Sequence, residues 1–280
     1  MVEWTNGDFY NSVIRKELVY STNDGIKMGK IIAIANQKGG VGKTTTSINL
    51  SSCLAEQGKK VLLVDIDPQG NATSGVGIIK QNLENTIYEL FLEECTISEC
   101  LTKSAVDNLN VLPSNVNLSG AEIDLIGVEG REYILKDTLE KIKDLYEYII
   151  IDCPPSLNIL TVNAMVAADS VIVPIQCEYY ALEGLSQLIH TINLIQERLN
   201  DKLIIDGIVF TMYDSRTNLS NEVMDNVKEN IQIKVYDTVI PRNVRLAEAP
   251  SYGLPIHMYD GKSTGAVAYK KLAEEIINEK

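Results

Sequence analysis

Glycine and lysine are concentrated in one short segment, QKGGVGKTTT at residues 37–46. Its three glycines allow the backbone to curl, so that successive N–H groups can point at phosphate oxygens. Lys43 can then reach the β- and γ-phosphates of a nucleoside triphosphate, and the Thr44 hydroxyl can bind Mg²⁺. The segment therefore predicts a phosphate-binding loop, with nucleotide contacts from Lys38, Gly39, Gly40, Val41, Gly42, Lys43, Thr44 and Thr45.

Acidic side chains follow two of the most apolar segments of the chain. DIDPQGNAT at 65–73 comes directly after one apolar run, and Asp152 ends another, IIIDCPP at 149–155. The ends of such strands, beside a phosphate loop, are where an α/β fold places ligand chemistry. Asp67 is expected to orient or deprotonate an attacking water. Asp65 and Asp152 are expected to support Mg²⁺ through its water shell.

The elements that must position these residues alternate along the chain. Apolar, β-branched runs predict strands at 30–35, 60–67, 110–114, 147–155, 170–175, 202–213 and 234–240. Helical spacing predicts helices at 42–58, 86–102, 119–144, 157–168, 180–199 and 264–278. Strands that are apolar on both faces and separated by helices indicate the α/β class. We expect a doubly wound, mostly parallel sheet with helices on both faces, of the P-loop NTPase type.

The chain of 280 residues is long enough for one large α/β domain. Residues 1–27 are polar and mixed, and are interpreted as an N-terminal arm, an extension or a start-site artefact. Met28 opens the run MGKIIAIANQKGG, so a single domain over 28–280 is expected. With no apolar segment near the length needed to span a bilayer and no secretory signal, a cytoplasmic location is expected.

Net charge and metal-binding residue types limit the possible functions. The net charge of −13 argues against nucleic-acid binding, although residues 202–280 hold 10 Lys and Arg against 11 Asp and Glu. A local basic patch therefore stays possible there. The two histidines nearly exclude a histidine-based metal site or catalytic triad. The five cysteines are interpreted as reduced thiols, most of them buried, because their spacing does not fit a metal site.

The phosphate loop departs from the strict pattern G-x-x-x-x-G-K-[ST], because Gln37 stands at the first glycine position and a second lysine, Lys38, follows it. This form is the deviant Walker A motif. Over residues 28–280 the chain resembles the ParA/Soj branch of the ParA–MinD ATPases. The resemblance implies ATP and Mg²⁺ as cofactors, weak basal ATP hydrolysis, a catalytic role for Asp67, and a homodimer when ATP is bound. It also implies that Lys38 crosses the dimer interface to the partner's ATP.

Later segments extend the resemblance. In IPRN at 240–243, it implies that Pro241 and Asn243 lie against the adenine. In two further segments, 211–223 and 240–255, it implies non-specific DNA binding by Arg216 and Arg245. It further implies a nucleoid-associated protein with a ParB-type centromere-binding partner. The mixed charges of the C-terminal AYKKLAEEIINEK disfavour MinD-like membrane binding, and the cysteines do not fit a shared iron–sulfur cluster.

Three functions stay open at this point. The first is a DNA-partitioning ATPase for a chromosome or a plasmid. The second is a cargo-positioning ATPase with the same chemistry that uses no DNA. The third is a regulator that binds nucleotide without turnover.

Overall fold

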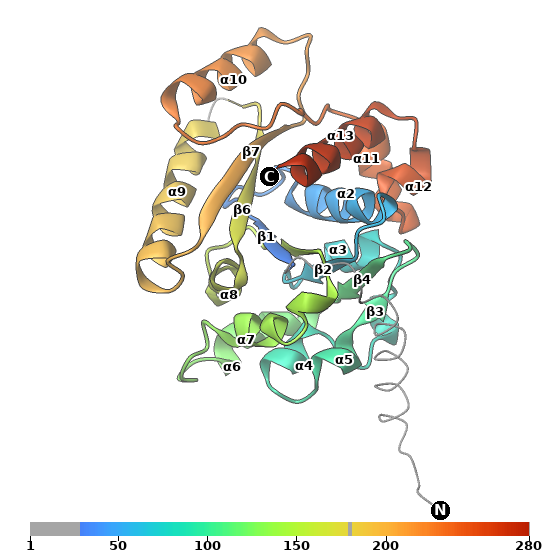
Figure 1. The fold of residues 1–280 in the computed structure, drawn as a ribbon, viewed down its shortest axis with the longest axis vertical. Helices are drawn as coiled ribbons and strands as arrows, with labels where there is room; N and C mark the ends of the chain where they lie inside the picture. Colours follow the sequence, from blue (N-terminus) through green and yellow to red (C-terminus); the bar gives the residue numbers. More distant parts are fainter. Residues whose placement is uncertain (1–28, 179–180, 280) are drawn as a thin grey trace, which may run out of the picture.

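The computed structural model describes residues 29–178 and 181–279 (Figure 1). The arm expected at 1–27 lies outside these ranges. Seven strands form one sheet: β1 (Lys30–Ile34), β2 (Val61–Asp65), β3 (Thr102–Lys103), β4 (Leu109–Leu112), β5 (Tyr148–Asp152), β6 (Ser170–Gln176) and β7 (Ile204–Thr211). Their order is β3-β4-β2-β5-β1-β6-β7. Only β3 is antiparallel to its neighbour, which confirms the predicted mostly parallel sheet.

The connections between strands contain the helices. They are α2 (Lys43–Glu56), α3 (Asn71–Gly75), α4 (Ile87–Phe91), α5 (Ile97–Cys100), α6 (Ala121–Asp124), α7 (Ile134–Glu140), α8 (Ile159–Ala167), α9 (Ala181–Arg198), α10 (Asn218–Asn230), α11 (Val244–Glu248), α12 (Ile256–Asp260) and α13 (Thr264–Asn278). Short 3₁₀ turns lie at Lys80–Asn82, Val116–Gly120, Lys143–Leu145 and Ala249–Tyr252. No helix of the described ranges is long and apolar enough to cross a membrane.

Both faces of the sheet are covered, so its strands are apolar throughout. Along β1, Ile31 and Ala33 point into the core beneath α7 and α8, whereas Ile32 and Ile34 point into the core beneath α2 and α13. Figure 1 shows these helix pairs on opposite faces. Successive side chains of a strand point to opposite faces of the sheet. Because each face has its own core, every position of the strand must be apolar.

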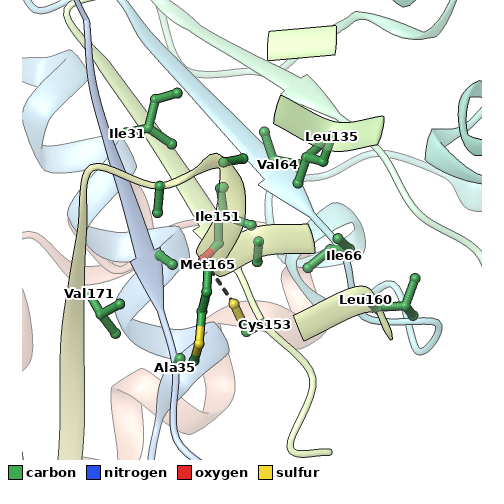
Figure 2. Packing of buried hydrophobic residues seen from close by; sticks show 14 of the residues in the cluster. Ile31, Ala35, Val64, Ile66, Leu135, Ile151, Cys153, Leu160, Met165 and Val171 are labelled. Carbon is green, nitrogen blue, oxygen red and sulfur yellow. Dashed lines mark hydrogen bonds between the residues drawn. The ribbon is translucent and has the colours of Figure 1, made fainter. Parts of the chain in front are cut away.

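Figure 2 shows the first of these cores, where Ile151 and Cys153 pack with Met165 of α8. The Cys153 thiol donates to the Ile151 carbonyl over 3.9 Å. All five cysteines are free thiols and four of them are buried, as the sequence analysis expected. Cys153 therefore packs as a small apolar residue directly after the strand that ends in Asp152.

Two predicted helices are wrong in extent, because turn-forming residues interrupt them. The helix expected at 86–102 is two short helices, α4 and α5, separated by Glu93 with a left-handed φ of 58°. The helix expected at 119–144 is broken between α6 and α7, where Gly127 and Gly130 have φ values of 82° and 73°. Left-handed backbone ends a helix, so neither pattern could continue.

The strand predicted at 234–240 is also wrong. This segment forms no continuous ladder with β7: isolated bridges join Ile208 with Val235 and Tyr213 with Pro241, and Ile240 N–H donates to the Phe210 carbonyl over 2.8 Å. Its Tyr236, which is 1% exposed, packs in the core beneath α13, whereas Val235 packs against the core on the opposite face. A short apolar run can therefore be buried without joining a sheet.

Candidate functional site

The phosphate-loop segment joins the carboxyl end of β1 to the first residue of α2, as the sequence predicts. Gly40 and Gly42 have φ values of 75° and 89°, and Gly42 is the N-cap residue of the helix. Most residues avoid this left-handed conformation, so glycine at these two positions allows the loop to turn tightly into the helix. The positive end of the helix dipole therefore lies at the loop.

Backbone N–H groups of the loop are available as donors. Within the described ranges, no hydrogen bond to protein involves the N–H groups of residues 39–45, whereas Thr46 N–H already donates to the Gly42 carbonyl. The first helical turn normally leaves its N–H groups unpaired, but four of these seven precede the helix. Successive unpaired N–H groups form an anion-binding concavity. The loop therefore fits a phosphate group.

Lys43 lies at the centre of this loop and is 6% exposed. Its Nζ donates to the Lys38 carbonyl over 3.1 Å. Burial lowers the pKa of the Lys43 ammonium, and the nearby carboxyls of Asp152 and Asp67 oppose that change. A buried cation next to unpaired N–H groups is the arrangement that a phosphate would neutralise.

The Lys38 side chain points toward Glu178. Its Nζ lies 2.5 Å from the Glu178 carboxylate, and both side chains are partly exposed, by 38% and 44%. Its backbone N–H donates to the Asn36 side chain over 3.0 Å. The Lys38 amine is therefore held at the surface of the loop and can be reached from outside the subunit.

The carboxylates of Asp65 and Asp152 lie on adjacent strands at paired positions of β2 and β5. Both are fully buried. Asp65 accepts hydrogen bonds from the N–H and hydroxyl of Thr73, over 2.8 and 2.7 Å. Asp152 Oδ1 accepts from the Ser47 hydroxyl over 2.8 Å. Its second oxygen, Oδ2, has no hydrogen-bond partner among the described residues.

Burial raises the pKa of both carboxyls above the ordinary range. At Asp152 the charge of Asp65 raises the pKa further, while the Ser47 and Thr44 hydroxyls lower it. Such an arrangement is costly for ionised groups unless a cation joins them. The buried oxygen without a partner on Asp152, with the Thr44 hydroxyl nearby, fits a hydrated Mg²⁺.

Groups of three or more His, Cys, Asp or Glu side chains able to hold a metal are absent from the described ranges. That is compatible with Mg²⁺, which keeps several waters and is usually bound by one or two carboxylates together with substrate phosphates.

Asp67 is 8% exposed and lies two residues beyond β2. Its Oδ1 accepts from Gln69 N–H over 2.9 Å. Its backbone N–H donates to Asp65 over 3.2 Å, and its carbonyl accepts from the Ser114 hydroxyl over 2.8 Å. The backbone of Asp67 is thus fixed on both sides, while its second carboxylate oxygen makes no hydrogen bond within the described ranges.

A pocket of ≈ 330 Å³ adjoins the phosphate loop. Its lining includes Gly42 and Thr45 from the loop and Pro241 and Asn243 from the later segment. The Asn243 side chain caps α11, accepting from Arg245 N–H over 2.8 Å, and its amide donates to Thr264 over 2.7 Å. In this state its polar atoms are occupied, so the pocket offers apolar walls more than a free amide.

Arg216 and Arg245 are exposed and lie on separate segments. The guanidinium of Arg216 binds Asp214 through two hydrogen bonds, over 2.8 and 2.6 Å, and this pairing lowers the pKa of Asp214. Arg245 pairs with Glu248 over 2.8 Å. Each cation is therefore partly neutralised by a carboxylate of its own subunit.

Sequence reasoning missed several residues that position the site. Glu178 holds Lys38, Thr73 and Ser114 hold the Asp65–Asp67 segment, and Thr211 donates to the Val41 carbonyl over 2.8 Å. Thr73 is the last residue of the quoted DIDPQGNAT segment, so its position was a usable signal. The others are far away in the sequence and carry no local pattern.

Comparisons with known proteins agree with this geometry. A family model described as an AAA domain matches residues 29–205. The sporulation initiation inhibitor protein Soj of Bacillus subtilis is 57% identical over 249 residues, which is 89% of this chain and 98% of Soj. The chain belongs to the ParA/Soj family of ATPases.

Two further proteins are similar to most of the chain. The chromosome partitioning protein ParA of Myxococcus xanthus is 51% identical over 250 residues, covering 89% of this chain and 88% of its own. A crystal structure from Mycobacterium smegmatis, titled cobyrinic acid a,c-diamide synthase with bound ATP analog and magnesium, is 39% identical with a TM-score of 0.79. It covers 89% of this chain and 94% of its own.

The two buried carboxyls are expected to make the stability of the folded protein depend on pH. Because the folded-state pKa of Asp152 is raised, its neutral form favours folding below about pH 4, the ordinary Asp pKa. That contribution is lost as the pH rises through the folded-state value. In protein stripped of divalent cations and nucleotide, we expect the urea midpoint to fall from about pH 5 to about pH 8.

The matched variant Asp152→Asn keeps the shape and removes the charge, so its midpoint should change much less over the same pH range. The exposed Asp201→Asn serves as a control and should behave as the unchanged protein. An unchanged protein whose midpoint rises steadily with pH would contradict the raised pKa.

Proposed function

We propose that this ParA/Soj-family protein is a weak ATP hydrolase of chromosome or plasmid partitioning. ATP binding closes a sandwich dimer, the dimer binds non-specific DNA, and hydrolysis stimulated by a ParB-type partner releases it. The observation that carries the ATPase part is the run of unpaired N–H groups at 39–45 around the buried Lys43. Together they supply donors and charge for a triphosphate. Within the described ranges the N–H groups have no protein partner, and the Lys43 amine donates to the Lys38 carbonyl.

Each site residue has a distinct role in this proposal. The N–H groups and Lys43 hold the phosphates, while Thr44, Asp65 and Asp152 hold Mg²⁺ directly or through its waters. A Mg²⁺ ion held by these residues would supply positive charge to the phosphates of the nucleotide. Asp67 orients the attacking water and accepts its proton.

The pocket beside Gly42 and Thr45 is proposed as the adenine site, with Pro241 as one apolar wall. Asn243 keeps its capping contacts and lines the same pocket. Because flat apolar walls discriminate poorly between purines, the site is expected to bind the base by shape and contact area.

Lys38 is proposed to act on the ATP of a second subunit. Its amine is held at the outer surface of the loop by Glu178 rather than over its own Lys43 site. An exposed ion pair is worth only about 0–1 kcal/mol, so it can be exchanged for a phosphate of the partner at little cost. A trans-acting cation of this kind stabilises transition-state charge.

DNA binding is proposed for the dimer, with Arg216 and Arg245 contributing from both subunits. Their local carboxylate partners reduce the net attraction, so affinity should be weak and sensitive to salt. Weak binding suits a protein that must release DNA after hydrolysis, and the net charge of −13 favours that release. A cytoplasmic, nucleoid-associated location follows from this proposal.

The deciding experiment is ATP-dependent DNA binding with and without these arginines. In gel shifts at low salt with unrelated duplexes, Arg216→Glu and Arg245→Glu should each strongly weaken the shift. In filter binding, each lost phosphate contact should lower the slope of log K against log salt by about 0.9. Weakening should be equal for all duplex sequences, since phosphate contacts carry no sequence information.

Arg198→Glu on α9 is the matched control, because Arg198 is exposed and undergoes the same charge change. It should retain the shift. A complete absence of ATP-dependent binding in the unchanged protein would favour the cargo-positioning alternative. Loss of binding in the control as well would show that net charge, not these two arginines, governs the interaction.

A further inference from the structure

A groove of ≈ 940 Å³ lies between the α4–α5 segment and the α6–α7 segment. These helices cover the face of the sheet opposite α2 and α13, so the groove is separate from the nucleotide pocket (Figure 1). The partly exposed apolar side chains of its lining are Leu92, Ile97, Tyr133 and Ile134. Val128 adds a large apolar side chain that is 44% exposed. None of the groove residues takes part in the proposed ATPase chemistry.

The charged residues of the groove have predominantly one sign. Its lining contains the exposed carboxylates of Glu93, Asp124, Glu129 and Asp137 and only one cation, Lys141. None of these five side chains forms an ion pair within the described ranges. The groove thus combines apolar contact surface with unneutralised negative charge.

The two sides of the groove are fixed before any partner arrives. The Tyr88 hydroxyl on α4 donates to Asp124 on α6 over 2.9 Å, which joins the two walls. Capping boxes formed by Thr86 with Glu89 and by Thr96 with Glu99 hold the starts of α4 and α5. A preformed concavity loses little conformational entropy when it is filled.

One wall is connected to the catalytic segment. Ile87 N–H, at the start of α4, donates to the Pro113 carbonyl over 2.9 Å. The next residue, Ser114, donates its hydroxyl to the Asp67 carbonyl. An occupant that contacts α4 therefore lies two hydrogen-bonded links from the backbone of Asp67.

We propose that this groove is a docking site for a short segment of another protein that presents apolar anchor residues flanked by Lys or Arg. The apolar lining takes the anchors, and the four carboxylates pair with the cations around them. Nucleic acid and anionic lipid are disfavoured by the same carboxylates. The chain's own residues 1–28 fit less well, because they contain more acidic than basic side chains.

Cys95 provides a local readout, because it lines the groove and is the only cysteine that is not buried. The probe is a short synthetic peptide in which pairs of leucine alternate with pairs of lysine. Cleavage after Lys80 and Lys103 gives one peptide that contains Cys95 and Cys100, so mass spectrometry can follow iodoacetamide alkylation at Cys95. With probe at ten times its dissociation constant, alkylation should slow about tenfold.

Four comparisons decide whether the effect belongs to the groove. A leucine–glutamate peptide and a serine–lysine peptide should give no protection. The first lacks the cations that pair with the carboxylates, and the second lacks the apolar anchors. Glu129→Gln with Asp137→Asn should weaken protection by the lysine peptide. Glu222→Gln with Asp225→Asn on α10 removes equal charge elsewhere and should preserve it.

Other results would overturn the proposal. Equal alkylation rates with and without the peptide would exclude docking in the groove. Full-length protein in which Cys95 is already protected, and loses that protection on removal of residues 1–28, would make the arm the occupant. Protection that grows with protein concentration alone would make it a second copy. The measurement uses no nucleotide, so its outcome is independent of the proposed ATPase activity.

Discussion

Replacing Asp67 with alanine is expected to abolish ATP hydrolysis while leaving the ATP-dependent dimer intact. Among residues 29–178 and 181–279, the carboxylate accepts one hydrogen bond, from Gln69 N–H, so its loss should cost about 1 kcal/mol of stability. Loss of a general base typically costs about 10²–10⁴-fold in rate. Phosphate release should therefore fall by that factor, while light scattering should show a persistent rise in mass with ATP.

Asp67→Asn provides the closer comparison, because it retains the acceptor for Gln69 N–H but cannot take a proton. It should be equally inactive and fold as well as the unchanged protein. The exposed Asp201→Ala should hydrolyse ATP normally. An Asp67→Ala protein that stays monomeric with ATP would contradict the proposed ATP-dependent dimer. One that still releases phosphate at the normal rate would contradict the catalytic role of Asp67.

The phosphate loop could be predicted because its chemistry is local. Gly40, Gly42, Lys43 and Thr44 follow one another in the sequence, and their backbone conformations follow from residue type. The carboxyl ends of β2 and β5 were equally predictable, because apolar strands that end in aspartate place the carboxylates at one edge of a parallel sheet. The predicted last helix, 264–278, coincides with α13.

The contacts that support those residues could not be predicted in the same way. Glu178 is 140 residues from Lys38, and Ser114 is 47 residues from Asp67. Such pairings depend on which strands become neighbours, and one sequence gives no pattern for that. The paired state of Arg216 is more local, since Asp214 lies two residues away, yet turn geometry decides whether the two side chains meet.

The interrupted helices show the same limit at shorter range. The segment 86–102 has helical spacing throughout, but two four-residue capping boxes, starting at Thr86 and Thr96, each favour a new helix start. Reading the caps together with the periodicity would have given α4 and α5. Residues at this break, Leu92, Glu93 and Cys95, line the groove between these helices and α6–α7.

Replacing Lys38 with glutamine is expected to reduce hydrolysis by about 10³–10⁵-fold, the range measured for trans-acting arginine fingers. The change removes the positive charge and leaves the loop backbone, whose shape depends on Gly40 and Gly42. ATP binding to the monomer should be nearly unchanged, because Lys43 and the loop N–H groups stay in place. Lys59→Gln, which breaks a similar exposed ion pair with Glu147, should have normal activity.

Mixing two inactive variants separates action within a subunit from action between subunits. Lys38→Gln retains its own phosphate site, whereas Lys43→Gln loses that site but retains Lys38. In a mixed dimer, the second subunit can supply its Lys38 to the ATP of the first, so one complete site forms. Phosphate release should therefore reappear on mixing, although each variant alone is inactive. If Lys38 acted on its own nucleotide, no combination would restore a site, and the mixture would stay as inactive as its parts.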